Sequence, residues 1–450
     1  MGQTFLTTFE EMTSHQREQL AIYVQRVGRL HSDQPIDVIM TDLSTFVGND
    51  VAAKFDLPKV SMLPLLMHMV VGPATWLPSL GTSFPVEMKF VQRLINFLIK
   101  LLTPIHGFWM LDRLNEVRAT QGIVPYRGMM DVVGAYSIVM APTVWGYDIP
   151  QPLCPNIRPL GVVTAIHGHS HMEKELKSFL ESDRCRTHGA VYVNFGTLAW
   201  VNDKLFEAIR TVLLGRNSQS IAVLKNLCVV WKVSETDRLD ELRRELTPLA
   251  DANSLPITTD RFFVTKRFAD PPEIMAHPNI RAFVTHCGDT SLGEAVEAGV
   301  PLVGIPIFAD QADVCQRMHE RGIGVYVGHK FEVTDVMFEE ALARVVSSRN
   351  QPAFRQNIRE MQQMSNFYGG AIGGAQFLET AVREGITGHF SCGFINWQAG
   401  GSPTSWLRMT VELIRIQQYD VLVLCGFLPL LLVWKATRWT IRLLVRRSLK

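Results

Sequence analysis

The sequence predicts an α/β protein with two Rossmann-like, doubly wound domains and an apolar helix near the C-terminal end. Short apolar runs alternate with helical patterns along most of the chain, as in parallel sheets covered by helices. A proline-dense stretch over residues 148–161 divides this alternation into two parts. The uncharged residues 421–434 then form a separate apolar run.

Composition supports two globular domains and excludes some functions. The chain has 450 residues, 47% of them hydrophobic, which is enough for two cores. Its 44 Lys and Arg residues balance 43 Asp and Glu residues, so no excess charge indicates nucleic-acid binding. The seven cysteines are odd in number and scattered. We read neither a disulfide framework nor a metal site from them, and they leave the redox compartment open.

Residues 1–150 predict one partial domain. A helical pattern covers residues 1–30, and a buried strand follows at 36–40. Asp42 comes directly after that strand. A helix at 49–55 and a strand at 59–61 complete a β-α-β unit, which implies a parallel sheet.

Residues 63–102 are rich in Met, Pro and Trp. Part of this range has the pattern of a helix with one apolar face beside basic residues. Such a face is most often packed in the core, but it also suits a membrane surface or the wall of an acceptor pocket. Residues 151–188 are expected to form a linker between the domains.

Residues 189–385 predict the second domain. Strands are expected at 190–195, 229–233 and 262–264, and helices at 334–346 and 354–383, the last broken by paired glycines. Gly196 and Thr197 make a sharp exit from the first of these strands.

The most informative stretch is 281–327, which reads as strand, loop, helix, strand, loop, helix, strand. Its first strand stops at His286, and Thr290 and Ser291 come just before the next helical pattern. A helix start offers unpaired N–H groups and partial positive charge, which suit phosphate. Gly288 would let a ligand approach the backbone closely.

This stretch resembles the donor-binding signature of the family 1 UDP-dependent glycosyltransferases, whose fold is GT-B. The residues that carry the resemblance are His286-Cys287-Gly288, Ser291, Glu294, Gly299-Val300-Pro301, Pro306 and Asp310-Gln311.

The resemblance implies a role for each matching residue. His286 and Ser291 would contact the diphosphate, and the Glu294 carboxylate would accept from the ribose hydroxyls. Asp310 and Gln311 would bind the transferred sugar. Each role has a plainer alternative: Ser291 and Glu294 form a capping box by spacing alone, and polar residues such as Asp310 and Gln311 are favoured at any helix N-terminus.

Further positions match less closely. Gly196 and Thr197 occupy a place that faces the phosphates in the family, although an ordinary strand-to-helix turn explains them equally well. Thr290 stands where the family more often has asparagine. Phe268 replaces the tryptophan that stacks on uracil, and Pro271 replaces a glutamine, which puts ribose recognition in doubt.

The N-terminal half departs further from the family. Asp42 matches the aspartate that orients a catalytic histidine, but nothing in this sequence matches the strand and Gly-His loop that should carry that histidine. Helix or turn capping is the alternative for Asp42. We therefore expect a chain truncated at its N-terminal end, with residues 1–150 as the acceptor-side domain.

The C-terminal end predicts a membrane anchor. Fourteen apolar residues of helix cover about 21 Å, less than the ~30 Å hydrocarbon core, so we extend the span to 419–439, where flanking basic residues can snorkel. A buried core helix is the alternative. Residues 386–418 would be membrane-proximal, and 440–450 a basic cytosolic tail that leaves the globular part on the lumenal side, as in the endoplasmic reticulum.

The sequence thus predicts a membrane-anchored enzyme that transfers a hexosyl or glucuronosyl group from a UDP-sugar to a small lipophilic alcohol or phenol, with inversion. We expect no metal and no cofactor besides the UDP-sugar co-substrate, and a homo- or hetero-oligomer remains open. The alternative is a non-catalytic membrane homologue that binds UDP-sugar or pairs with an active transferase. Soluble sterol or antibiotic glycosyltransferases share the signature but lack such a tail.

Overall fold

The protein is described here by a computed structural model. It covers residues 2–42, 45–63, 77–126, 128, 132, 137–143, 148–149, 153, 156–163, 172–197, 199–216, 221–247, 255–268 and 270–383, with only the backbone described for 2–12 and 101–109. Residues Met1–Phe390 form one compact unit. The predicted segments 386–418, 419–439 and 440–450 lie outside the described residues. Within the described ranges, no helix has the length and apolar composition to cross a membrane.

The N-terminal half is built on a parallel sheet with strand order β1-β2-β3-β4. The predicted β-α-β unit is confirmed, but the first strand begins at Ile39, because the Ile36 N–H donates to His31 Nδ1 (2.9 Å) in the turn after the first helix. The fourth strand lies in the range expected to be linker. The elements are α1 (Gly2–Asp33), β1 (Ile39–Asp42), α2 (Phe46–Lys54), β2 (Lys59–Met62), α3 (Phe90–Ala119), β3 (Ile138–Ala141) and β4 (Ile157–Pro159).

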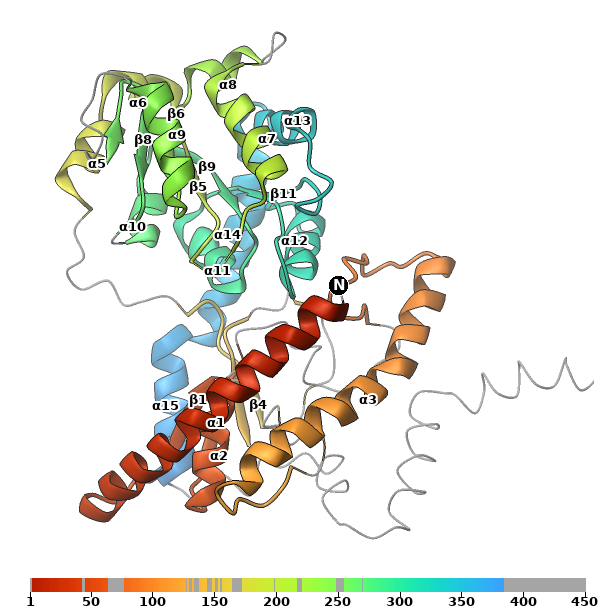
Figure 1. Cartoon of the computed structure of the whole chain (residues 1–450). Coiled ribbons are helices and arrows are strands. Elements are labelled where there is room, and N and C mark those ends of the chain that lie inside the picture. The colour runs from red at the N-terminus through yellow and green to blue at the C-terminus, as the bar shows by residue number, and fades with distance from the viewer. Residues whose placement is uncertain are drawn as a thin grey trace, which may run out of the picture. The chain divides into compact units, whose positions relative to one another are not determined.

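The C-terminal half contains a seven-stranded sheet of order β11-β10-β9-β5-β6-β8-β7, in which only β7 is antiparallel (Figure 1). Its strands are β5 (Ala190–Asn194), β6 (Cys228–Lys232), β7 (Ile257–Thr258), β8 (Phe262–Thr265), β9 (Ile280–Thr285), β10 (Leu302–Gly304) and β11 (Gly324–Tyr326). Its helices are α5 (Lys174–Leu180), α6 (Asp183–His188), α7 (Asp203–Leu214), α8 (Ala222–Asn226), α9 (Thr236–Leu246), α10 (Pro271–Ala276), α11 (Asp289–Ala298), α12 (Gln311–Glu320), α13 (Asp335–Val346), α14 (Gln351–Tyr368) and α15 (Gly370–Arg383).

Each face of this sheet is buried under helices, as a doubly wound fold requires. Val191 and Val193 of β5 join the core formed with α7, α9 and α13. Ala190 and Tyr192 point to the opposite face and join the core formed with α10, α11, α12 and α14. Because successive strand residues face opposite sides, a strand buried on both faces is apolar throughout. That is why its sequence reads as an unbroken apolar run.

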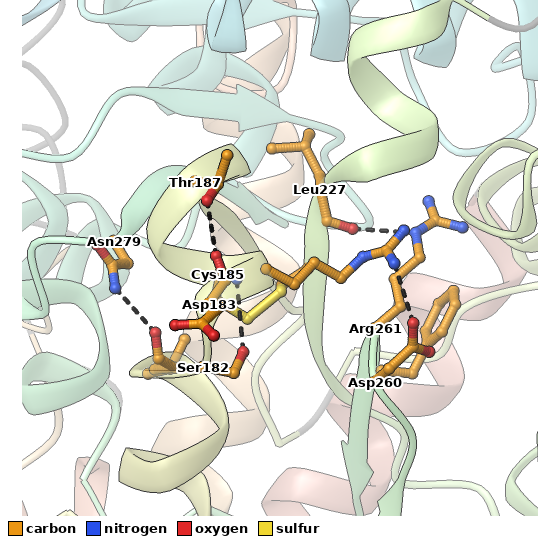
Figure 2. The surroundings of a disulfide bond; sticks show 12 residues. Ser182, Asp183, Cys185, Thr187, Leu227, Asp260, Arg261 and Asn279 are labelled. Atoms are coloured by element: carbon orange, nitrogen blue, oxygen red, sulfur yellow. Dashed lines mark hydrogen bonds and ion pairs between the residues drawn. A yellow bond between two sulfur atoms is a disulfide. The ribbon is translucent and has the colours of Figure 1, made fainter.

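Four of the cysteines form two disulfides, which the sequence did not reveal. Cys185 of α6 is joined to Cys228 of β6, and Cys287 to Cys315. Figure 2 shows the first pair beside the start of α6, where Ser182 Oγ accepts from the Cys185 N–H (3.4 Å). Partners 43 and 28 residues apart show no recognisable spacing, so their pairing emerges only once the strands and helices are placed.

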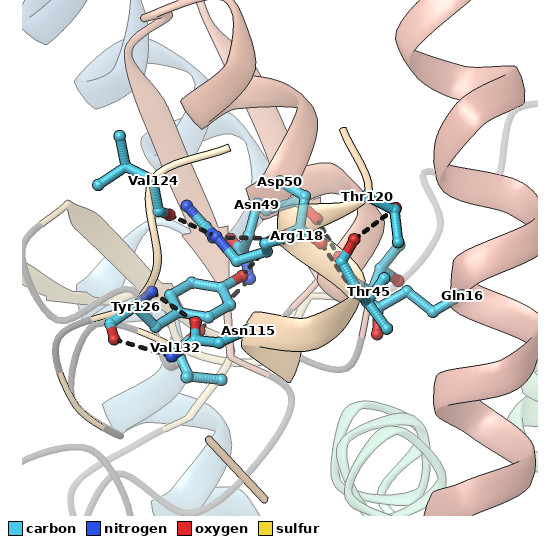
Figure 3. Close-up of polar contacts among 12 residues, drawn as sticks. Gln16, Thr45, Asn49, Asp50, Asn115, Arg118, Thr120, Val124, Tyr126 and Val132 are labelled. Carbon is cyan, nitrogen blue, oxygen red and sulfur yellow. Dashed lines mark hydrogen bonds and ion pairs between the residues drawn. The ribbon is translucent and has the colours of Figure 1, made fainter. Parts of the chain in front are cut away.

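A buried carboxylate ties three helices of the N-terminal half together (Figure 3). Asp50 of α2 is fully buried and accepts from Gln16 Nε2 of α1 (2.7 Å), Arg118 Nη1 of α3 (2.8 Å) and the Tyr126 hydroxyl (2.8 Å). The Arg118 guanidinium also lies over the Tyr126 ring, 3.7 Å from its centroid. Burial raises the pKa of Asp50, and its three donors counteract that rise.

Removing this carboxylate should strongly destabilise the N-terminal half. Asp50→Ala leaves the buried Arg118 charge without its counter-ion, so we expect the free energy of unfolding to fall by about 3–5 kcal/mol. Urea denaturation followed by tryptophan fluorescence measures this, with the exposed Glu18→Ala on α1 as the control. Equal stability of the two variants would contradict a role for Asp50 in holding the helices together.

Candidate functional site

The candidate site lies where three parallel strands end side by side. Asn194 at the end of β5 is paired with Thr285 at the end of β9, and Thr285 in turn with Gly304 at the end of β10. The loops that follow these strands therefore leave the sheet at one edge, where open α/β sheets bind ligands. They carry most of the residues that the sequence singled out.

The His286 ring is enclosed between two glycines. A Cβ built on Gly196 would lie 2.9 Å from His286 Cε1, and one on Gly288 would lie 2.7 Å from Nε2. Gly196 also has φ of +76°, which favours glycine. The predicted proximity of the Gly196 turn to the His286 loop is thus present in the structure, whereas Thr197 beside it is exposed.

The imidazole has an unsatisfied position. Among the described residues, His286 Nδ1 is buried and has no hydrogen-bond partner. Burial lowers the pKa of His286 to about 4, and the positive charge of Lys232 contributes further. A buried nitrogen of a neutral imidazole is normally hydrogen-bonded, and none of the described residues supplies a partner here, so the position suits a ligand contact.

Lys232 is a residue that the sequence reasoning missed. It ends β6, and its ammonium donates to the Gly196 carbonyl (2.7 Å). Burial lowers its pKa, as does the nearby Arg267 charge. The available signal was its place at the end of the strand next to β5. A small hollow opens beside Lys232 and Gly196, on the side of α7 and α9, but none of the residues from 281 to 327 lines it.

Helix α11 begins three residues earlier than predicted, at Asp289. Gly288 is its N-cap and supplies no side-chain hydrogen bond, and the Leu292 N–H donates to the Gly288 carbonyl (3.0 Å). Thr290 and Ser291 therefore lie in the first turn rather than before it. The capping-box alternative for Ser291 and Glu294 is wrong, because Ser291 is not at the N-cap. The N-cap Gly288 thus supplies no side-chain partner to the first N–H groups of α11, which follow the His286 loop directly and suit an anion.

The loop before α11 is held by a disulfide. Cys287 has φ of +62°, unusual for a side-chain-bearing residue, and is bonded to Cys315 of α12. A Cβ on Gly304 would lie 2.5 and 2.6 Å from the two sulfur atoms, so glycine is needed beneath the bridge. The disulfide thereby links the loop that carries His286 to the helix that follows Asp310.

Asp310 and Gln311 stand at the N-terminal end of α12, where they were predicted. Burial raises the pKa of Asp310 to about 6, and the Asp313 charge adds to this rise. Gln311 is buried, and its Oε1 accepts from the Ile307 and Phe308 N–H groups (2.9 and 3.0 Å). Its carbonyl oxygen thus shapes the loop after β10, which leaves the Nε2 group as the part suited to a ligand.

Phe268 and Pro271 have structural explanations. Phe268 is half-buried, edge-on to Tyr192 (5.7 Å between centroids) and stacked with Phe263 (6.2 Å). Pro271 is the first residue of α10, a position that suits proline because its missing N–H has no intrahelical partner there. Asp270, the N-cap, accepts from the Glu273 N–H (3.4 Å).

Asp42 belongs to the other sheet, where it ends β1. The N-cap of α2 is Thr45, so the helix-cap alternative for Asp42 is wrong, although its backbone carbonyl accepts from the Thr45 N–H (3.0 Å) in a turn. Among the described residues, no three His, Cys, Asp or Glu side chains are grouped as metal ligands.

Comparison with known proteins agrees with this geometry. The sequence profile of the family described as UDP-glucoronosyl and UDP-glucosyl transferase matches residues 29–366. The chain belongs to that family. The resemblance found in the sequence is thereby confirmed.

Relatives of the UDP-glycosyltransferase family are distant in sequence. Rattus norvegicus 2-hydroxyacylsphingosine 1-beta-galactosyltransferase is 24% identical over 295 residues, which cover 65% of this chain and 48% of the relative. Homo sapiens UDP-glucuronosyltransferase 1A6 is 25% identical over 346 residues (74% and 57%), and Phaeomoniella chlamydospora UDP-glycosyltransferase 1 is 26% identical over 335 (69% and 62%). The chain thus spans about half to two thirds of the length of these relatives.

Solved structures share the fold. The glycotransferase of kitacinnamycin has a TM-score of 0.55 at 14% identity, covering 83% of this chain and 82% of its own. UDP-glucose: anthocyanidin 3-O-glucosyltransferase, solved in complex with UDP, has a TM-score of 0.52 at 17% identity, covering 82% and 80%. The α/β fold with GT-B relatives is as the sequence predicted.

The enclosed imidazole predicts a pH-dependent stability. Between pH 6.5, where an unfolded histidine takes up a proton, and pH 4, where His286 does so, residue 286 binds more protons in the unfolded chain than in the folded one. The contribution of His286 to stability therefore falls as the pH drops through this window, by about 3 kcal/mol.

His286→Gln removes this contribution, so the difference in unfolding free energy between wild type and variant should change across pH 4–6.5. Urea titrations at fixed pH values measure it, with the exposed His188→Gln as the control. Parallel curves for wild type and His286→Gln would show that His286 titrates normally.

Proposed function

We propose that this chain binds a UDP-sugar at the edge formed by β5, β9 and β10, and that the protein transfers a hexosyl or glucuronosyl group from it to a small lipophilic hydroxyl acceptor. Transfer would proceed with inversion and without a metal or other cofactor. The observation that carries this proposal is the buried, unpaired Nδ1 of His286 beside the uncapped N-terminus of α11.

The phosphate chemistry follows from these two features. In its neutral form, His286 carries one N–H and offers it to a phosphate oxygen without adding a full charge. The first-turn N–H groups of α11 supply further donors and partial positive charge. The hydroxyls of Ser291 and Thr290 lie in the same turn, and Lys232 places a cation at the edge of the site. Together these groups suit a diphosphate held without a metal ion.

The carboxylates suit the sugar parts of the donor. Glu294 follows one turn after the phosphate-binding groups on α11, and a carboxylate accepts two hydrogen bonds from a vicinal diol such as that of ribose. Asp310 and the Nε2 group of Gln311 would accept from and donate to hydroxyls of the transferred sugar. Although burial raises the pKa of Asp310 to about 6, this value still lies below neutral pH. The carboxyl group therefore remains largely ionised at pH 7 and can accept hydrogen bonds.

A non-catalytic role remains the second candidate. Asp42 ends β1, and the sequence offers no matching Gly-His loop for it to orient. A chain that binds UDP-sugar without transferring it, or that pairs with an active transferase, would not need such a loop.

We also propose an anchored protein with its globular part in an oxidising compartment. Residues 421–434 are uncharged and precede a basic tail, which suits a single membrane span over 419–439 with its basic end in the cytosol. The disulfides Cys185–Cys228 and Cys287–Cys315 support a lumenal location for the globular part, since such bonds persist in oxidising compartments.

Calorimetric titration with UDP tests donor binding directly. His286→Ala should weaken UDP binding by about tenfold or more, because a phosphate loses its hydrogen-bond donor. Asp310→Asn should leave UDP affinity within about twofold and reduce sugar transfer by the protein about 10²-fold. The exposed Asp203→Asn is the matched control. If wild type binds no UDP, the proposal fails; if wild type binds UDP but transfers no sugar, the non-catalytic role is favoured.

A further inference from the structure

Helix α12 makes a second set of contacts, beyond the donor residues at its N-terminal end. Three of its side chains, spaced at i, i+4 and i+7, hold a single stretch of backbone from the N-terminal half. The residues are Asp313, Arg317 and Glu320, and the stretch is residues 79–86, here called the 79–86 segment.

Asp313 makes the central contact. It is 3% exposed, and its two carboxylate oxygens accept from the backbone N–H groups of Gly81 (2.5 Å) and Ser83 (2.9 Å). A buried carboxylate satisfied by backbone donors is a strong, charge-assisted arrangement. Helix N-terminal preference alone, which explains an acidic residue here from sequence, does not explain why both oxygens point to another part of the chain.

The next two turns of α12 continue the contact. Arg317, 2% exposed, donates to the Phe84 carbonyl (2.5 Å), and Glu320 accepts from the Val86 N–H (3.0 Å). Arg317 and Glu320 also form an ion pair (3.2 Å). Side chains on one face of α12 therefore hold the backbone of the 79–86 segment at residues 81, 83, 84 and 86.

The 79–86 segment has a conformation that needs such support. Gly81 and Ser83 have φ of +77° and +53°, and the second is costly for a residue with a Cβ. At its other end the segment is tied to α3, because the Ser79 N–H donates to Asn96 Oδ1 (2.6 Å). It thus connects α12 to the first turns of α3.

At its N-terminal end, just before Asp313, α12 carries the proposed sugar-binding residues. Asp310 and Gln311 are its N-cap and first residue, and Cys315 bonds it to the loop of His286. Val314 and Met318 are fully buried in the core beneath it. One rigid helix therefore meets the donor edge at its start and the segment leading to α3 along its length.

We propose that Asp313 is a positioning residue for sugar transfer. It holds the 79–86 segment, and through this segment the start of α3, in a fixed position relative to the donor residues at the N-terminus of α12. This inference rests on the proposed function. The acceptor would then be presented to the sugar by a part of the N-terminal half whose place is set by the donor helix. Its contribution would appear in acceptor use and not in UDP affinity.

Hydrogen exchange of the backbone amides tests the contact itself. Asp313→Asn turns one acceptor oxygen into an N–H donor facing a backbone N–H, so amide exchange in the 79–86 segment should accelerate by about tenfold. Exchange in β5 and β9 should remain unchanged. Asp313→Glu keeps two acceptor oxygens and should restore part of the protection, and the exposed Glu340→Gln on α13 serves as the control.

Two further measurements give the functional consequence. In Asp313→Asn, the UDP dissociation constant should stay within about twofold, while the KM of the protein for 4-nitrophenol should rise about tenfold with the KM for UDP-sugar unchanged. Unchanged exchange in the 79–86 segment would overturn the inference, as would accelerated exchange with an unchanged acceptor KM. If wild type binds no UDP, the proposed function fails; accelerated exchange in Asp313→Asn would still establish the anchoring contact by itself.

Discussion

The parallel pairing of β5, β9 and β10 is the constraint on which the candidate site depends. Residues 194, 285 and 304 are neighbours in register, so the chain must leave the sheet three times at one edge. Each exit is shaped differently: by a glycine at 196, by a strained cysteine at 287, and by Gln311, whose side chain holds the loop after β10. The chemistry gathers there because strand direction, and not any single motif, brings the loops together.

Much of this half was predictable because its strands are buried on both faces and its helices on one. That burial explains the apolar runs at 190–195 and 282–284. It also explains the helical spacing of the apolar residues in α13 and α14. His286, Asp310 and Gln311 were predictable because residues just after a strand must lie at the sheet edge. The start of α11 was not, because its N-cap is a glycine without a capping side chain.

Long-range partnerships were beyond the reach of the sequence. Asp313 looks like an ordinary acidic residue in a first helical turn, and its partners lie some 230 positions away. Lys232 ends a strand as many lysines do. The hydrophobic pattern of α2 does not indicate that the Asp50 side chain is buried. Hydrogen-bond donors from three separate segments nevertheless converge on its carboxylate. Such groups are recognised only when the fold brings the segments together.

The bridge between Cys287 and Cys315 has a consequence for how this site can vary. The two sulfur atoms occupy the space where a side chain at residue 304 would lie, so bridge and side chain exclude each other. Substitutions at residues 287, 304 and 315 are therefore coupled to one another, although 28 positions separate the outer two. Replacing one cysteine alone leaves the other sulfur atom 2.5 or 2.6 Å from the position of an alanine Cβ at 304, and the Met318 methyl lies 2.9 Å from it. Among descendants of this sequence, a side chain at 304 therefore requires that both sulfur atoms be displaced.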